Sequence, residues 1–286
     1  GGESRLAQNR KRLRRGMYLL PSLFTTANMA FGYFAISHAM QGSVADPWHF
    51  DFAARAIGFA IVFDMFDGRI ARMTGTSSDF GRELDSLADT ITFGIAPAFL
   101  AFAWGVRAVL PVPDTPLTNH LAAAGWLVTF LFVICSAARL ARFNIQSSPG
   151  PNRPEHKHFV GLPTPASAGL VAAIVHFNGG TPISDMLWVP FWLVLLMATA
   201  ILMVSTWRYH SFKHLDFRKQ HKFAVVILMA TIGGIIVFWS QTVLLVIATS
   251  YVLSGVIAKL LQSVRRGRIE SPAQQRKTRD SRSEAH

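Results

Sequence analysis

The sequence predicts an all-α integral membrane protein with about eight transmembrane helices. Of its 286 residues, 51% are hydrophobic and 12% are aromatic, which is too apolar for an ordinary soluble domain. The apolar residues form runs of about 20, the length that a helix needs to cross the hydrocarbon core of a bilayer. Lys and Arg gather between these runs instead of being spread along the chain. Together these observations indicate a bundle of membrane-spanning helices.

The apolar runs predict the positions of the spans in order. They lie at 18–40, 50–73, 84–106, 120–142, 163–178, 186–206, 223–239 and 242–262. The last two divide one apolar stretch that contains a single charged residue, Lys259. As one helix this stretch would be about 60 Å long, roughly twice the thickness of the hydrocarbon core, so we expect it to turn back near Ser240 and Gln241.

The distribution of basic residues predicts the orientation. An even number of spans puts both termini on one side of the membrane, together with the loops 74–83, 143–162 and 207–222. Of the 28 Lys and Arg residues, all but Arg55 and Arg107 fall on that side or at helix ends facing it. Because positive residues are retained in the cytoplasm, we expect a multi-pass protein of the cell (inner) membrane with both termini cytoplasmic.

The chain divides into three predicted regions. Residues 1–17 form a basic cytoplasmic segment, 18–263 the transmembrane domain, and 264–286 a basic tail whose polar composition predicts disorder. The net charge of +12 could indicate nucleic-acid binding. Because the charge lies beside membrane spans, we favour anionic lipid headgroups as its partners and expect no nucleic acid.

The stretch DMFDGRIARMTGTSSDFGRELDSLAD carries the chemistry. Asp64 and Asp67 are three residues apart, and Asp85 and Asp89 are four apart, so each pair shares one face of a helix. If the two helices form a hairpin, the four carboxylates converge at the membrane surface, and such a cluster needs a cation. Hard divalent metals prefer oxygen ligands. The alternative, ion pairs with neighbouring arginines, would not require this spacing.

This pattern, together with Gly68, Ala71, Arg72 and Gly81, resembles the signature of the CDP-alcohol phosphotransferases. The resemblance implies a membrane enzyme that transfers a phosphatidyl or similar group from a CDP-linked donor to an alcohol and releases CMP. It implies that two divalent cations, Mg²⁺ or Mn²⁺, are bound by the aspartates and that Asp89 is also the general base. The metal ligands implied are Asp64, Asp67, Asp85 and Asp89, and the donor-binding positions are Gly68, Arg72, Ser78 and Gly81.

Four stretches outside the acidic motif indicate which alcohol is the acceptor. The segments YLLPSLFTTANMAFG (18–32), RLARFN (139–144), FVGLPTPASAG (159–169) and VSTWRYHSFKHLDFRK (204–219) resemble the membrane-embedded phosphatidylserine synthases of bacteria. That resemblance implies CDP-diacylglycerol as donor, L-serine as acceptor and a homodimer. Ser22, where these enzymes usually have Asn, departs from the pattern. The phosphatidylglycerophosphate and phosphatidylinositol phosphate synthases share the aspartate motif and remain the family alternatives.

Further polar residues are candidates for substrate binding. Thr25 and Asn28, in the first span, match donor-binding positions by resemblance; the alternative is hydrogen bonding between helices. Serine requires a cation near its carboxylate and an oxygen near its ammonium group. The candidates are Arg139, Arg142, Asn144 and Arg208. An arginine fork suits a carboxylate or phosphate, although arginines at helix ends also snorkel to the interface.

Two other classes of protein compete with an enzyme. A secondary transporter also has about eight spans and intramembrane carboxylates, but such sites lie near the midplane between repeated halves. Here the acids cluster at one interface, and no repeat is evident. A membrane scaffold with basic tails would leave the aspartate spacing unexplained. We therefore expect an enzyme.

Overall fold

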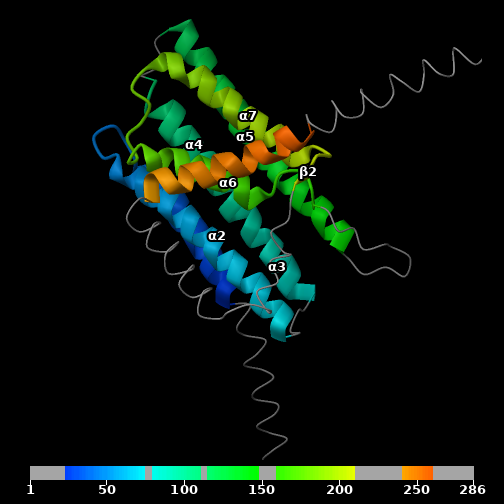
Figure 1. The fold of residues 1–286 in the computed structure, drawn as a ribbon. Coiled ribbons are helices and arrows are strands. Elements are labelled where there is room, and N and C mark those ends of the chain that lie inside the picture. Colours follow the sequence, from blue (N-terminus) through cyan, green and yellow to red (C-terminus); the bar gives the residue numbers. More distant parts are fainter. Residues whose placement is uncertain (1–22, 75–78, 111–114, 148–158, 210–239, 260–286) are drawn as a thin grey trace, which may run out of the picture.

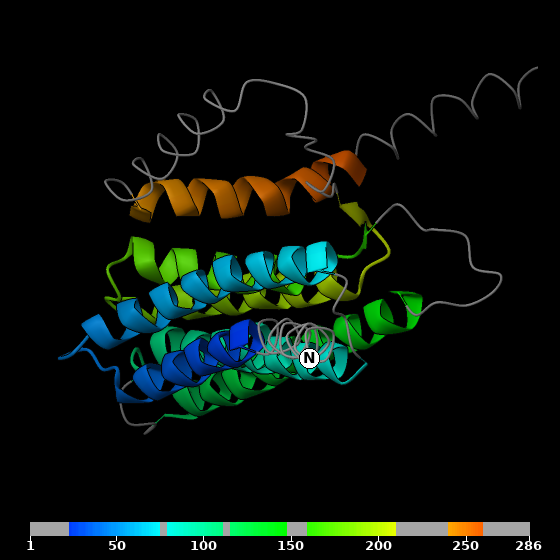
Figure 2. The same cartoon turned by 90° about the horizontal axis from the view of Figure 1, so that it is seen from below.

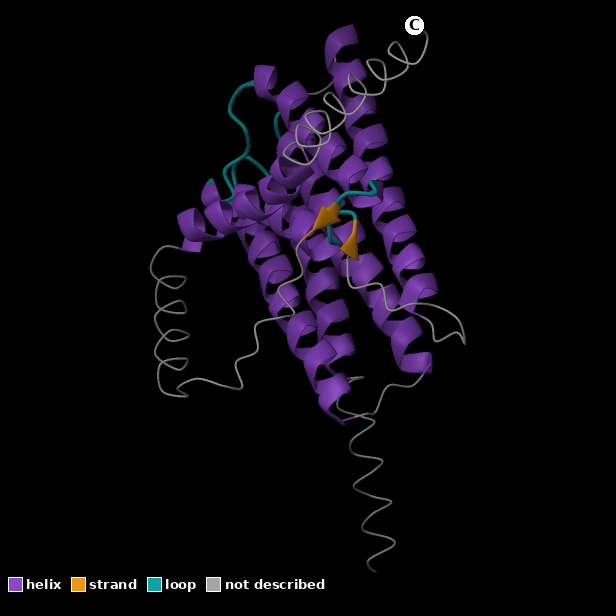
Figure 3. Ribbon diagram, turned by 45° about the vertical axis from the view of Figure 1, so that its right-hand side comes forward, coloured by secondary structure: helices purple, strands orange, loops and turns teal. Residues whose placement is uncertain are grey.

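The computed structural model describes residues 23–74, 79–110, 115–147, 159–209 and 240–259; within these ranges the side chains of 66–74, 79, 146–147, 159–160 and 208–209 lie outside the description. Apart from one short two-stranded ribbon, the regular structure of these residues is helical, as Figure 3 shows. The predicted all-α class is therefore confirmed for the part of the chain that is described. The N-terminal segment 1–17 and the tail 264–286 lie outside it.

The helices follow the predicted apolar runs (Figure 1). The first helix occupies residues 23–41, and the last helix is Ser240–Lys259. Between them lie α2 (Trp48–Thr74), α3 (Asp79–Asp89), η1 (Thr90–Ile95), α4 (Ala96–Phe102), η2 (Ala103–Arg107), α5 (Pro116–Ser147), α6 (Thr164–Phe177), η3 (Met186–Trp188) and α7 (Val189–Val204). The predicted span 223–239 lies outside the described residues. Every other predicted span coincides with a helix or a continuous run of helices.

Four described segments are long and apolar enough to cross a membrane. They are Phe80–Arg107, Pro116–Ile145, Met186–Val204 and Ser240–Lys259. Helix α6 is apolar but has 14 residues, about 21 Å at 1.5 Å per residue. Helix α2 has 27 residues and contains several charged ones. The described part is thus a multi-span helical bundle whose shorter and more polar helices lie among long apolar ones.

The segment from α3 to η2 is one continuous rod with two π-helical turns, η1 and η2. Pro97, at the start of α4, has no N–H to donate to a carbonyl one turn earlier. The N–H of Ala96 instead reaches back five residues to the carbonyl of Ile91, which is the π-helical pattern. This wider turn follows Asp89 directly and buries Thr92, Phe93 and Gly94.

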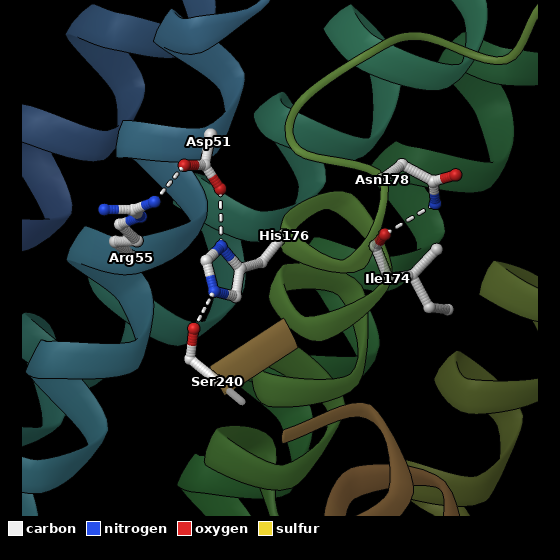
Figure 4. Close-up of polar contacts among 6 residues, drawn as sticks. All are labelled: Asp51, Arg55, Ile174, His176, Asn178 and Ser240. Atoms are coloured by element: carbon white, nitrogen blue, oxygen red, sulfur yellow. Dashed lines mark hydrogen bonds and ion pairs between the residues drawn. The ribbon is translucent and has the colours of Figure 1, made fainter. Parts of the chain in front are cut away.

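Helices α2 and α6 are antiparallel neighbours. An added Cβ at Gly169 would lie 3.2 Å from Ile61, so the small residue lets the two helices approach closely. Near the start of α2, Asp51 accepts contacts from Arg55 (2.7 Å) and from His176 Nδ1, and His176 Nε2 lies 2.9 Å from the Ser240 hydroxyl. Figure 4 shows this polar network joining α2, α6 and the last helix. It lies about 20 Å along α2 from Asp64, at the end of the helix remote from the acidic motif.

In the core, tryptophan side chains pack against small residues of neighbouring helices. Trp192 of α7 donates to the Ala101 carbonyl (3.0 Å), and a Cβ at Gly105 would lie only 2.2 Å from the Trp192 ring nitrogen. Helix α5 packs along α7 and against the rod. Figure 2 shows the last helix at the edge of this bundle, and little of its surface is buried. The other helices therefore form the central packing unit.

The ribbon joins the start of α6 to the end of α7. Strands β1 (Phe159–Val160) and β2 (Arg208–Tyr209) pair antiparallel. Gly161, which follows β1, has φ +86°, and an added Cβ would lie 2.3 Å from the Met203 carbonyl oxygen. Only glycine combines this backbone conformation with this close approach. The turn fixes where α6 begins.

Candidate active site

Three of the four predicted metal-ligating aspartates meet in the structure. Asp64 comes from α2, and Asp85 and Asp89 come from α3. One carboxylate oxygen from each lies within 4.8 Å of the others, and all three side chains are half-buried. Asp85 and Asp89 lie one turn apart on α3 and therefore point to the same side of that helix, where Asp64 meets them. The side chain of Asp67 lies outside the described residues.

This donor set suits a hard divalent cation. Three carboxylate oxygens at such separations repel one another, and a Mg²⁺ or Mn²⁺ ion accepts oxygen ligands. The half-buried position adds to the repulsion, because water screens these charges less than it would at a free surface. The residues present therefore fit a metal site.

Asn28 of the first helix reaches the same cluster. Its side-chain nitrogen donates to Asp89 Oδ1 at 3.2 Å, and Asn28 is 1% exposed. The Thr92 hydroxyl donates to the backbone carbonyl of Asn28 at 3.0 Å. Thr25, one turn earlier, is also buried. Of the two polar residues expected in the first span, Asn28 thus contacts an aspartate directly.

Arg139 of α5 brings a positive charge to the surroundings of Asp89. It is 9% exposed and interacts electrostatically with Asp89 and with Tyr251 of the last helix. Its guanidinium carbon lies 6.0 Å from the centre of the Phe143 ring. Among the side chains that the structure describes, Arg139 is the only buried Lys or Arg. A buried arginine beside a carboxylate cluster is suited to binding an anion that enters the site.

The other candidates near the end of α5 have different surroundings. Arg142 donates to the Val204 carbonyl (3.2 Å) at the end of α7, and Asn144 donates to the Ser86 hydroxyl (3.0 Å) on α3. Arg139 and Arg142, three residues apart on α5, therefore have separate partners. Arg208 forms part of β2, and its side chain lies outside the described residues.

The predicted donor-binding positions are mostly beyond the description. Gly81 lies in the first turn of α3 and is half-buried. Gly68 and Arg72 lie in the last turns of α2 with side-chain positions that are not described, and Ser78 falls outside the described residues. Their proposed roles remain predictions.

Two residues at the site had no role in the sequence-based prediction. Thr92 and Tyr251 each lie inside an apolar run, where a polar side chain signals a buried partner. That signal could have marked both as candidates, but it does not identify the partner. The hydrogen bond from Thr92 to Asn28 and the electrostatic interaction of Tyr251 with Arg139 join residues far apart in the chain.

Comparison with known proteins agrees with this geometry. Residues 18–181 match the CDP-alcohol phosphatidyltransferase family. The chain is 34% identical over 222 residues to the CDP-diacylglycerol–serine O-phosphatidyltransferase of Helicobacter pylori, covering 76% of this chain and 82% of the relative. Proteins with the same name from Mycobacterium tuberculosis (35% over 201 residues; 67% of this chain, 62% of the relative) and Methanocaldococcus jannaschii (32% over 177 residues; 62% and 72%) are also similar.

The matched region runs from the first span through α6 and includes all four aspartates of the motif. It covers more than half of the chain, and three of those aspartates converge in space. The chain belongs to the CDP-alcohol phosphatidyltransferase family.

Proposed function

We propose that this protein is a phosphatidylserine synthase, which transfers the phosphatidyl group of CDP-diacylglycerol to the hydroxyl of L-serine and releases CMP. The observation that carries the proposal is the convergence of Asp64, Asp85 and Asp89 from two helices in a chain of this family. The serine specificity is supported by relatives that bear the name CDP-diacylglycerol–serine O-phosphatidyltransferase.

The aspartates would hold two divalent cations, Mg²⁺ or Mn²⁺, with Asp67 completing the set. When bound, these ions would neutralise the diphosphate of the donor and the charge that develops on the departing CMP. Gly68 and Gly81 would leave room for the nucleotide, because glycine has no side chain to clash. Arg72, Ser78 and Thr25 would contribute donor contacts.

Asp89 would act as the general base. It accepts the proton of the serine hydroxyl as the hydroxyl oxygen attacks the phosphorus that bears the diacylglycerol group, and the bond from this phosphorus to the CMP oxygen breaks. A direct displacement of this kind inverts the configuration at phosphorus. Retention of configuration would require a covalent intermediate instead.

Arg139 would bind the serine carboxylate. It is buried and close to Asp89, so the carboxylate and hydroxyl of one small acceptor can reach both residues. A phosphorylated alcohol carries an additional negative charge and calls for more than one cation. The choice of serine over such an alcohol is supported by the names of the relatives. Arg142, Asn144 and Arg208 would form the cytoplasmic entrance.

The setting of the site follows from the apolar helices. We propose about eight transmembrane helices over residues 18–263, with both termini and the active site on the cytoplasmic side. CDP-diacylglycerol would enter laterally from the bilayer, and serine from the cytoplasm. The basic ends, 1–17 and 264–286, would contact anionic headgroups. A homodimer is proposed from the resemblance to phosphatidylserine synthases.

The test is an assay of the purified, detergent-solubilised protein with CDP-diacylglycerol and Mn²⁺ or Mg²⁺. Serine, glycerol 3-phosphate and inositol phosphate are supplied in parallel, and CMP and lipid products are measured. We expect CMP release coupled to phosphatidylserine and dependent on serine. Turnover with another alcohol alone would overturn the choice of acceptor but leave the reaction class. A complete lack of CMP release would instead favour a transporter or a scaffold.

A further inference from the structure

We propose that Asn28 is a positioning residue: its side-chain amide holds the Asp89 carboxylate in the orientation from which it takes the acceptor proton. This role differs from the donor contact that the resemblance implies for Asn28. The inference rests on the proposed role of Asp89 as general base. It makes the first helix part of the catalytic machinery through one hydrogen bond.

The geometry of the contact supports this role. Asn28 Nδ2 donates to Asp89 Oδ1 at 3.2 Å between residues 61 positions apart. The reversed amide would place its oxygen against the carboxylate oxygen, and the two would repel each other, so the carboxylate itself selects the observed orientation. With Oδ1 engaged, the other carboxylate oxygen is the one left to face a substrate or a metal.

The opposite end of the amide shows that packing does not explain the residue. Asn28 Oδ1 is buried and has no hydrogen-bond partner among the described residues. Burying an unpartnered acceptor costs about 1–3 kcal/mol, whereas an apolar side chain of similar size avoids that cost. The only hydrogen bond assigned to this side chain is the one to Asp89. The amide is therefore explained better by its effect on Asp89 than by its contribution to the fold.

A second contact fixes the backbone of Asn28. The Thr92 hydroxyl donates to the Asn28 carbonyl at 3.0 Å, and Thr92 lies in the π-helical turn that follows Asp89. Gly32, one turn after Asn28, allows this approach, since an added Cβ would lie 2.5 Å from the Thr92 hydroxyl oxygen. The consecutive elements α3 and η1 thus bind Asn28 at its side chain and at its backbone, respectively.

This arrangement predicts an effect on turnover and not on donor affinity. If Asn28 acts through Asp89, its loss misplaces the base by a fraction of an ångström to an ångström, an error that can cost up to about 100-fold in rate. A direct donor contact would instead change the KM for CDP-diacylglycerol. A positioning role therefore lowers kcat, whereas a donor contact raises the KM for CDP-diacylglycerol.

The experiment compares Asn28→Ala and Asn28→Leu with the wild-type full-length protein, measuring kcat, the KM for both substrates and thermal unfolding. We expect kcat to fall by about 10- to 100-fold and the KM for CDP-diacylglycerol to change by less than about threefold. Asn28→Leu should unfold at or above the wild-type temperature. Asn178→Ala is the matched control, because Asn178 is exposed at the far end of α6 and donates only to the Ile174 carbonyl of its own helix (Figure 4).

Thr92 provides a second, independent pair of variants. Thr92→Val keeps the shape but removes the hydroxyl, and we expect kcat to fall by about 3- to 10-fold. Thr92→Ser restores the hydroxyl and should return most of this activity. Thr199→Val is the control, because the buried Thr199 hydroxyl donates to the Leu196 carbonyl within its own helix.

Either of two results would overturn the inference. A rise of tenfold or more in the KM for CDP-diacylglycerol with unchanged kcat would make Asn28 a donor contact. If kcat and KM of both Asn28 variants stay within twofold of the wild-type values, Asn28 has no role in catalysis or donor binding. The comparison uses whichever alcohol the wild-type protein accepts, so failure with serine alone would count against the proposed acceptor and not against the role of Asn28.

Discussion

Replacing Asp89 with Asn should stabilise the metal-free protein while removing its activity. In the structure, Asp89 lies with Asp64 and Asp85 in a cluster whose carboxylate oxygens are within 4.8 Å of one another. When all three are ionised and no cation is bound, each pair is repulsive. Asn has nearly the same shape as Asp and still offers an oxygen to the Asn28 amide, so the substitution changes mainly the charge.

The size of the effect follows from the separations. At an effective dielectric constant of about 20, two unit charges 4.8 Å apart repel by roughly 3.5 kcal/mol, and Asp89 takes part in two such pairs. Arg139 attracts Asp89, and the loss of this attraction offsets about one of the two pairs. Because the three side chains are half-buried, screening by water reduces the remainder further. We therefore expect a net gain of about 1–2 kcal/mol in the free energy of unfolding, which corresponds to roughly 2–8 °C in Tm for a domain of this size.

The assay is thermal unfolding in detergent with a chelator and then with Mn²⁺. Wild-type protein should gain stability when Mn²⁺ is added, because a ligand that binds only the folded state stabilises it. Without metal, Asp89→Asn should unfold at a higher temperature than the wild type, and added Mn²⁺ should raise this temperature only slightly. Its turnover should be about 10²- to 10⁴-fold slower. Asp51→Asn is the control: its carboxylate is paired with His176 and Arg55, so this variant should be less stable, with an unchanged Mn²⁺ response. A less stable Asp89→Asn variant that kept its full Mn²⁺ response would refute the reasoning.

Three further predictions concern other parts of the molecule. Arg139→Lys should raise the KM for serine by about tenfold or more, because an ammonium group lacks the planar fork of arginine. Arg55→Lys, at the far end of α2, should leave this KM unchanged. Equal KM values for Arg139→Lys and wild type in steady-state assays would contradict the prediction. Gly161→Ala should lower the free energy of unfolding by more than about 2 kcal/mol, because Gly161 has φ +86° and a Cβ there would meet the Met203 carbonyl. The control is Gly58→Ala, whose added Cβ meets nothing within 4 Å. It should be neutral or stabilising in the same thermal unfolding assay. Chelation with EDTA should abolish CMP release and added Mn²⁺ or Mg²⁺ should restore it; release that persists in EDTA would exclude a metal-dependent reaction.

Much of the candidate site could be predicted because its members are close in the sequence. The spacing of Asp85 and Asp89 places them one turn apart on a helix, and Asp64 lies at the end of the preceding apolar run. Helical periodicity and the connection between two neighbouring helices are enough to bring these three together. The apolar runs likewise predicted the described helices to within a few residues at most ends, because run length and helix length are set by the same bilayer.

Contacts between distant helices were not predictable in this way. Arg139 and Arg142 share a helix and were both candidates for binding serine. In the structure Arg139 interacts with Asp89, whereas Arg142 donates to the Val204 carbonyl. Asn28 was assigned to the donor by resemblance, and its contact with Asp89 depends on the packing of the first helix against η1. Helical spacing gives the direction of a side chain but not the element that it meets.

The sequence by itself determined the class of the protein, the course of its helices and the acidic motif, because apolar run length and residue spacing act locally along the chain. Only the tertiary structure decided which polar groups share an environment: Asn28 with Asp89, Arg139 with Tyr251, and Asp51 with His176 and Ser240. These pairs depend on the packing of helices that are distant in the chain. Buried polar groups form hydrogen bonds in most cases, and the packing of the helices decides which residue is the partner.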